Sequence, residues 1–243
     1  MPDGFTALDL TAVGVFFAIW FAYTSLFDGR LRRPTAINSL MLILRREWMR
    51  RLLHRDARIV DSQLVGHTIH SAAFFASTTM LVLAGLIGVL GSADRVYAAS
   101  ANISLLLGGG QRLFEWKLML LIGIFIYAFL KFTWALRQFN YFCAVIGSAP
   151  DASEDPAETE AYAGRMTEVL THAVRELNAG VRAYYFAFAS FGWFIHPIAF
   201  MASTLLMVLV LGRRQLGSPT AHALREHAEA LERSRAARRS ARD

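Results

Sequence analysis

Two histidines stand out among the residues that could do chemistry, because each lies in a long apolar segment. His70 opens the stretch HSAAFFAST and His196 opens HPIAFMAST, and the two stretches agree at six of nine positions. Ionisable residues inside membrane-spanning helices are costly and are functional candidates by default. A facing pair of imidazoles could ligate a haem or a metal ion, with His67 as a further ligand, or could relay protons. The alternative is that each histidine hydrogen-bonds to a neighbouring helix and supports packing.

The hydroxyl groups of the same two stretches are the next candidates, together with one lysine. Ser77, Thr78, Ser203 and Thr204 could line a hydrated path, and Lys131 lies in another apolar segment. The alternative for the hydroxyls is bonding to their own backbone carbonyls or between helices. Lys131 could reach the membrane interface by snorkelling, or it could bind an anion or pair with a carboxylate.

Three arginines could bind an anion or a lipid phosphate. Arg45 and Arg46 are adjacent, and Arg182 precedes the aromatic run Tyr184–Phe186. A guanidinium group presents a planar fork of donors that matches phosphate and carboxylate oxygens. Stacking of Arg182 on the aromatic rings at headgroup level is the alternative interpretation.

Other kinds of site find no support in the sequence. No nucleophile–base motif is present, so we predict no catalytic residue, and enzyme activity stays open without a residue to carry it. The single cysteine, Cys143, excludes an intrachain disulfide. The net charge of +6 comes mostly from arginines that flank apolar segments, which favours a membrane surface over nucleic acid as the partner.

Four apolar segments must position these candidates, and each is long enough to cross a bilayer. They run over about 7–27, 64–90, 116–136 and 184–211. A helix of about 20 residues crosses the hydrocarbon core. We therefore predict an all-α membrane protein with four transmembrane helices. Replacement of the second or the fourth segment by a pair of re-entrant helices is disfavoured, because roughly 14 residues per arm cannot cross.

Two amphipathic helices are predicted between the apolar segments, both on the cytoplasmic side. The first carries apolar residues at helical spacing between Ile37 and Leu52, and the second does so between Tyr162 and Leu177. Such helices could lie at the lipid interface or pack against the helix bundle. The sequence favours neither of these two alternatives.

The order of these elements suggests a tandem duplication. Residues 7–91 and 116–211 each hold an apolar segment, an amphipathic helix and another apolar segment, which predicts parallel repeats about an axis normal to the membrane. Chance similarity between common membrane residues is the alternative. We predict one membrane domain over 1–215 and a polar tail over 216–243 that is a solvated helix or disordered.

The distribution of arginines predicts the orientation. The region 28–63 carries nine arginines and the first six residues carry none, so this region is expected in the cytoplasm and both termini outside a bacterial-type plasma membrane. Eight arginines after Leu211 argue against an outer C-terminus.

Four motifs resemble one known family. Gly180–Ala187 and Phe129–Asn140 combine uncommon residues in a fixed order, and Arg45–Trp48 and Phe74–Thr78 accompany them. The chain resembles the domain of unknown function family 599 from the first apolar segment to about Gln215. The resemblance implies a four-span membrane protein and implies no activity, substrate or catalytic residue.

Three functional hypotheses follow from the sequence. The first is a protein that binds or moves a small solute or ion as a homo-oligomer. The second is a haem- or metal-binding redox protein, and the third is an accessory or scaffold subunit. The expected partners are the lipid bilayer and anionic lipid headgroups, and nucleic acid is not expected.

Overall fold

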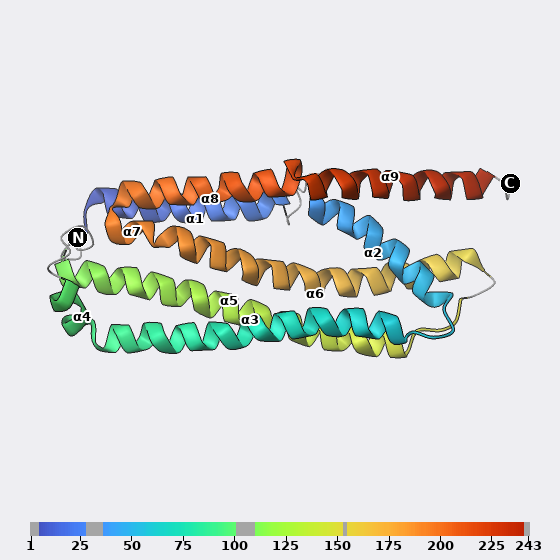
Figure 1. Cartoon of the computed structure of the whole chain (residues 1–243), viewed down its shortest axis with the longest axis horizontal. Helices are drawn as coiled ribbons and strands as arrows, with labels where there is room; N and C mark the ends of the chain where they lie inside the picture. Colours follow the sequence, from blue (N-terminus) through green and yellow to red (C-terminus); the bar gives the residue numbers. More distant parts are fainter. Residues whose placement is uncertain (1–4, 28–35, 101–109, 153–154, 241–243) are drawn as a thin grey trace.

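The computed structural model describes residues 5–27, 36–100, 110–152 and 155–240, and this part of the chain is an elongated bundle of helices (Figure 1). The helices are α1 (Ala7–Phe27), α2 (Ile37–Leu53), α3 (Ile59–Gly91), α4 (Ala93–Ser100), α5 (Gly110–Gly147), α6 (Pro156–Ser190), α7 (Gly192–Ile195), α8 (Pro197–Gly217) and α9 (Pro219–Ser240). Four stretches are long and apolar enough to cross a membrane: α1, α3, α5 and Pro197–Ala237, which joins α8 to most of α9. The predicted all-α membrane fold is confirmed.

The prediction of one continuous helix over the fourth apolar segment is wrong. α6 ends at Ser190, and α8 begins only at Pro197. Proline forces the preceding residue into an extended conformation, and His196 has φ −164° and ψ 147°. A Cβ atom on Gly192 would lie 2.6 Å from Ser203 Oγ and 2.8 Å from the Ala199 carbonyl oxygen, so this close turn requires glycine. The chain therefore reverses here, and α6 and α8 are antiparallel.

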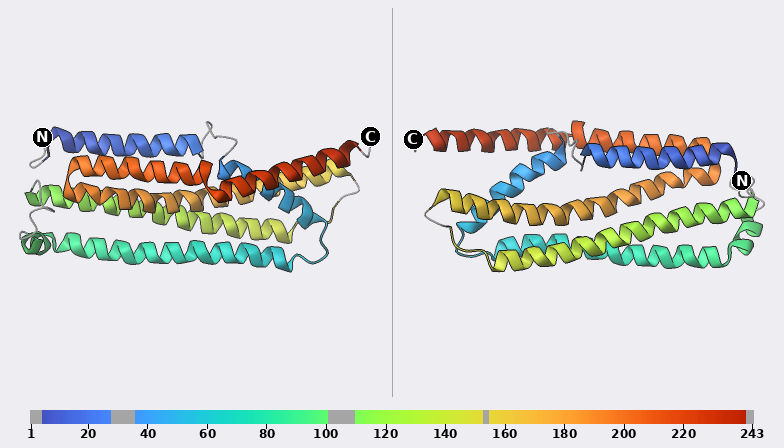
Figure 2. Two further views of the ribbon diagram at one scale, coloured as in Figure 1. Left: turned by 45° about the horizontal axis from the view of Figure 1, so that its top comes forward. Right: turned by 180° about the vertical axis from the view of Figure 1, so that it is seen from behind.

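The directions of the long helices follow from this reversal. α5 runs from the end of the bundle that holds α4 to the end that holds α2, α1 and α8 run in the same direction as far as the middle of the bundle, and α3 and α6 run back (Figure 1). We call these the α4 end and the α2 end. The described chain starts at the α4 end and finishes at the α2 end, with α9 extending beyond α1 in both views of Figure 2. The first and the last described helices, α1 and α9, therefore lie toward opposite ends of the bundle.

The same directions contradict a duplication with parallel repeats. The stretch beginning at His70 lies within α3, and the one beginning at His196 opens α8. α3 and α8 run in opposite directions (Figure 1), whereas repeats about an axis normal to the membrane would run in the same direction. The similarity of the two stretches therefore does not reflect equivalent positions in the fold.

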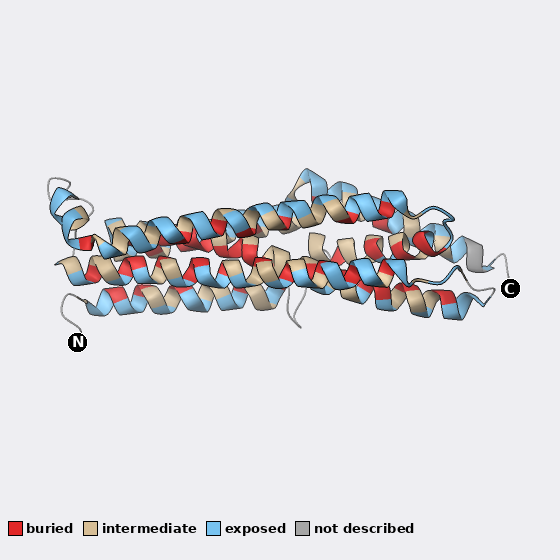
Figure 3. Cartoon of the chain, turned by 90° about the horizontal axis from the view of Figure 1, so that it is seen from below, coloured by how far each residue is buried: buried red, intermediate tan, exposed pale blue. Residues whose placement is uncertain are grey.

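Apolar side chains form two main clusters along the bundle, and Figure 3 shows buried residues on the inner faces of the helices over its length. One cluster, toward the α4 end, contains Phe16, Leu121, Phe132, Phe186 and Phe200. The other, toward the α2 end, contains Met49, Leu52, Phe139, Phe142, Met166 and Leu170. The second cluster joins α2 and the first half of α6 to α3 and α5. Both predicted amphipathic helices therefore exist, and they pack against the bundle.

The outer surface toward the α4 end is apolar. Phe21 on α1 is 76% exposed, Leu81 on α3 is 75% exposed and Leu206 on α8 is 62% exposed. Apolar surface of this extent on helices of spanning length is the surface that lipid covers in a membrane protein. The region of the bundle that includes α1, α7 and α8 is therefore the membrane-embedded part.

The polar tail is a helix that packs against α2. Ala221 and Ala228 on α9 are buried, and Arg235 binds Glu47 of α2 with an N–O distance of 2.5 Å. The prediction of a solvated helix or a disordered tail is corrected on this point, because one face of α9 is covered by the protein.

Candidate functional site

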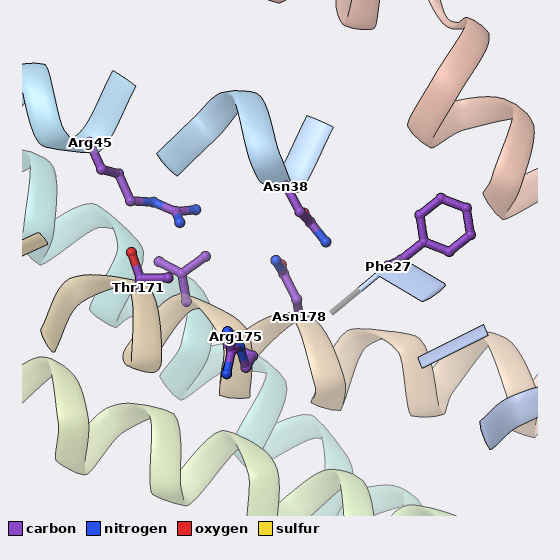
Figure 4. Close-up of a pocket in the computed structure, with 7 residues that line it drawn as sticks. Phe27, Asn38, Arg45, Thr171, Arg175 and Asn178 are labelled. Atoms are coloured by element: carbon purple, nitrogen blue, oxygen red, sulfur yellow. The ribbon is translucent and has the colours of Figure 1, made fainter. Parts of the chain in front are cut away.

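A polar cavity lies where the membrane-embedded part meets the α2 end. It has a volume of about 330 Å³ and lies between α2, α6, α8 and the last turns of α1. Its polar lining residues are Tyr23, Asn38, Arg45, Asn178, Arg182, Tyr185 and Gln215. A smaller adjoining pocket shares Asn38, Arg45 and Asn178 and adds Thr171 and Arg175 (Figure 4). We call the two together the arginine cavity.

Arg45 and Arg182 supply positive charge to this cavity from two different helices. The residues are only 9% and 7% exposed, respectively, which is unusual for arginine. The guanidinium group of Arg182 lies 5.7 Å from the centre of the Tyr23 ring, so the predicted contact with an aromatic ring exists, although the ring belongs to α1. Tyr185, one turn after Arg182, accepts a hydrogen bond from Arg214 on α8 at 3.3 Å.

The other polar groups of the cavity converge on the same space. Figure 4 shows Asn38 of α2 and Asn178 of α6 pointing toward one another, with Arg45 extending over Thr171. Thr171 Oγ1 and Gln215 Oε1 are buried and have no hydrogen-bond partner in the structure. Buried polar atoms are normally paired. The Thr171 hydroxyl can donate to a bound acceptor, whereas Gln215 Oε1 can only accept a hydrogen bond. No Asp or Glu is present among the described lining residues.

Arg46 does not belong to this site. Its side chain binds Glu160 of α6 at 2.5 Å, and Arg50 binds the same carboxylate. Burial by itself raises the pKa of Glu160, but the hydrogen bonds and charges of Arg50 and Arg46 outweigh it and lower the pKa below its usual value. The structure therefore separates the three predicted arginines into a cavity pair and a structural ion pair.

Lys131 pairs with a carboxylate, which is one of the alternatives that the sequence leaves open. Its Nζ atom lies 2.7 Å from Glu176 of α6 and 5.5 Å from the centre of the Tyr127 ring. The pair joins α5 to α6 on a different face from the arginine cavity. Glu176 was not predicted, because its segment reads as a polar helix face.

The hydroxyl groups predicted to line a path are engaged in helix packing or lie at the surface. Thr204 donates to the Phe200 carbonyl at 2.7 Å, and Ser203 donates to the Ala189 carbonyl at 2.6 Å and so joins α8 to α6. Ser77 is exposed and Thr78 is partly exposed. The neighbouring Thr79 hydroxyl links α3 to α6 through a hydrogen bond with Tyr184 at 2.9 Å.

The histidines are not brought together. His67 and His70 are exposed on α3, and His196 is exposed and caps α8, its Nδ1 accepting from the Ile198 amide at 3.2 Å. His70 lies 21 residues before the α4 end of α3, or about 30 Å along the helix, whereas His196 lies at that end. These residues do not fit a haem or metal site between His70 and His196. The described residues hold no group of three metal-binding side chains.

Asp9, which the sequence places one turn into the first apolar segment, is buried near the α4 end rather than solvated. Asp9 accepts hydrogen bonds from Trp193 at 2.8 Å and from the Thr6 hydroxyl at 2.6 Å, and Lys117 is buried with its Nζ 5.9 Å from the Trp193 ring centre. These contacts hold α7 against α1 and α5. The available signal was an acidic residue one turn into an otherwise apolar segment.

The remaining cavity residues carry a weak signal in the sequence. Thr171, Asn178, Arg182 and Tyr185 are separated by seven, four and three positions, so they share one face of α6. The apolar stripe on the neighbouring face of α6 is the stronger pattern, so the sequence did not predict a polar site at this spacing.

Comparison with known proteins adds the family. A family model described as "Protein of unknown function, DUF599" matches residues 11–220. The chain belongs to this family. The match covers α2, α6 and α8, and every residue that lines the arginine cavity lies within the matched range. No curated protein and no solved structure matches the chain.

Proposed function

We propose that this membrane protein binds a small anion that carries a phosphate or carboxylate group, in the arginine cavity and from the cytoplasmic side. The observation that carries the proposal is the convergence of Arg45 and Arg182, from two helices, on one cavity that also holds the buried Thr171 hydroxyl. Charge-assisted hydrogen bonds from guanidinium groups are about twice as strong as neutral ones. Asn38 and Asn178 would add amide donors.

Two sources can supply this chemistry, because the cavity lies beside the last turn of α1, where headgroups lie in a membrane. A soluble anion would enter from the cytoplasm, and an anionic lipid would present its phosphate from the bilayer. Binding, rather than a conducting path, is the part of the transport hypothesis that we retain. The hydroxyl groups that would have lined a path bond to backbone carbonyls or lie at the surface.

The test is binding by the purified full-length protein in uncharged detergent. We expect inorganic phosphate to raise the thermal transition, or phosphatidylglycerol to be retained in native mass spectrometry, according to the source. Arg45→Lys and Arg182→Lys keep the charge but lose the planar fork, and Arg182→Gln loses both, so affinity should fall by about tenfold or more.

Arg213→Gln is the matched control, because Arg213 is exposed on α8 and does not line the cavity. Unchanged binding in this variant, with loss in the cavity variants, supports the proposal. Absence of binding to both probes, or an equal loss in Arg213→Gln, rejects it.

We also propose that the chain crosses the membrane five times, so that the N-terminus is outside and α9 is cytoplasmic. The fifth crossing is the part of α6 from Ala179 onward together with α7, because Asn178 shares a pocket with Phe27 at the end of α1 and the segment runs beside α1 and α8. This topology gathers the nine arginines of 28–63 and the eight arginines after Leu211 on one side. With four crossings, by contrast, these two arginine-rich regions would lie on opposite sides of the membrane.

Labelling of single cysteines with a membrane-impermeant reagent tests this topology. Native Cys143 is exposed near the α2 end of α5. In a Cys143→Ser background, Ala230→Cys on α9 should react from the same side as Cys143, and Ala98→Cys on α4 from the opposite side. Reaction of Ala230→Cys and Ala98→Cys from one side would restore the four-crossing topology.

A further inference from the structure

An apolar groove runs between α1 and α5 on the surface of the membrane-embedded part. Its volume is about 500 Å³. The lining residues are Phe17, Trp20, Phe21, Thr24, Met119, Leu120, Gly123, Ile124 and Tyr127. Trp20 forms the floor, because it stacks on Phe186 with ring centres 4.6 Å apart and meets Tyr127 edge-on at 5.7 Å. The groove is thus built on rigid aromatic contacts.

The groove continues into a charged pocket toward the α2 end. Tyr127 lines both, and the second pocket, of about 600 Å³, adds Lys131, Trp134, Arg137 and Glu176. On α5, positions 123, 127, 131 and 134 are separated by four, four and three residues and so form one stripe. The stripe changes from apolar to charged along its length.

We propose that the groove and the pocket together bind one phospholipid with a primary amine in its headgroup. An acyl chain lies over Gly123 between α1 and α5. The phosphate is held by Lys131 and Arg137, and the amine donates to Glu176. A carboxylate oxygen accepts more than one hydrogen bond, so Glu176 can keep Lys131 as a partner.

The shape and the charges favour a lipid over a second copy of this chain. Close helix pairs in membranes need small residues on both surfaces. Here Gly123 and Thr24 are the two small residues in a lining of bulky side chains such as Phe17, Phe21 and Met119. The charged end lies at the level where α1 finishes, as a headgroup would, and it carries both signs of charge, as a zwitterionic headgroup requires.

This site is separate from the arginine cavity. α1 and α6 contribute to both sites, but the arginine cavity shares no lining residue with the groove or the charged pocket. Substitutions in one therefore leave the other intact, and each proposal can fail alone.

The test is native mass spectrometry of the full-length protein after mild delipidation and exposure to defined lipids. We expect phosphatidylethanolamine to be retained about tenfold better than phosphatidylcholine, whose methylated amine cannot donate to Glu176. Gly123→Phe should fill the groove and abolish retention, because a Cβ at Gly123 meets no atom within 4 Å and the fold can accept it. Glu176→Gln should remove the preference between the two lipids.

Gly85→Phe is the matched control, since Gly85 on α3 is equally open but lies outside the groove. Retention in this variant, with loss in Gly123→Phe, supports the site. Equal retention of all lipids, or retention that survives Gly123→Phe, means an unspecific lipid shell and overturns the proposal. A dimer that Gly123→Phe dissociates, with no lipid retained, assigns the groove to a second copy and overturns it too.

Discussion

Gly180→Ala is expected to lower the thermal transition of the detergent-solubilised protein, although alanine is the better helix former. A Cβ atom on Gly180 would lie 2.5 to 2.8 Å from three carbons of the Phe132 ring. Phe132 cannot retreat, because it is fully buried, stacks on Phe75 with ring centres 5.4 Å apart and meets Tyr184 at 5.9 Å. Overpacking of this kind costs about 1–3 kcal/mol, which exceeds the roughly 0.5–1 kcal/mol gained in helix propensity.

The matched control is Gly164→Ala in the same helix, where a Cβ meets no atom within 4 Å. This variant should be neutral or stabilised. Phe132→Leu should reduce the cost of Gly180→Ala, so that the double variant is more stable than the sum of the single effects predicts. Equal transitions for Gly180→Ala and Gly164→Ala would show that α5 and α6 do not approach as closely as the structure indicates.

The same contact explains part of what the sequence could not predict. Apolar composition and helical periodicity were sufficient for α1, α2, α3 and α5, because each depends on local residues. The reversal between α6 and α8 depends on a close tertiary contact between Gly192 and Ser203. Pro197 is a local signal of a break, because proline disfavours a helical conformation at His196, but it does not by itself predict a reversal of the chain. The re-entrant alternative was disfavoured because each arm would hold roughly 14 residues of the apolar segment. In the structure, α6 and α8 are longer, because both helices continue into polar sequence.

The candidate site was partly predictable for a similar reason. Arg45 and Arg46 are equivalent in composition, but adjacent positions on a helix are separated by about 100°. One therefore faces the cavity, and the other faces Glu160. The structure does not bring His70 and His196 together, because a repeated motif carries no information about helix direction. Arg182, which ends the polar half of α6, lines the cavity together with Arg45.

The second large effect is expected for the docking of α9 against α2, because the carboxylate of Glu47 on α2 holds Arg235 of α9. Glu47 accepts hydrogen bonds from Arg235 at 2.5 and 3.1 Å and from Arg51 at 3.0 Å, and Arg50 lies 3.5 Å away. Burial raises the pKa of Glu47, but the hydrogen bonds and charges of Arg235 and Arg51 outweigh it and lower the pKa below its ordinary value of 4.5. The ionised carboxylate is therefore the form that holds α9.

The sign of the pH dependence follows from this lowered pKa. The stabilisation by Glu47 is fully present above pH 4.5 and is lost as the pH falls further, through the lower pKa of the docked state. With Arg235 only 28% exposed, the contact should contribute about 1–2 kcal/mol, equivalent to a 5–30-fold change in the docking equilibrium. Hydrogen exchange of the α9 amides, corrected for the intrinsic effect of pH, should therefore accelerate by this factor upon acidification.

Glu47→Gln should show the fast exchange already at pH 7 and should remove the dependence on pH. Glu229→Gln is the control, because Glu229 lies on α9 itself and forms only a long ion pair of 4.0 Å with Arg233, one turn away. This variant should exchange as the native protein does. If Glu47→Gln leaves α9 protected at pH 7, the helix is held by its buried alanines, Ala221 and Ala228, and the Arg235 contact is incidental.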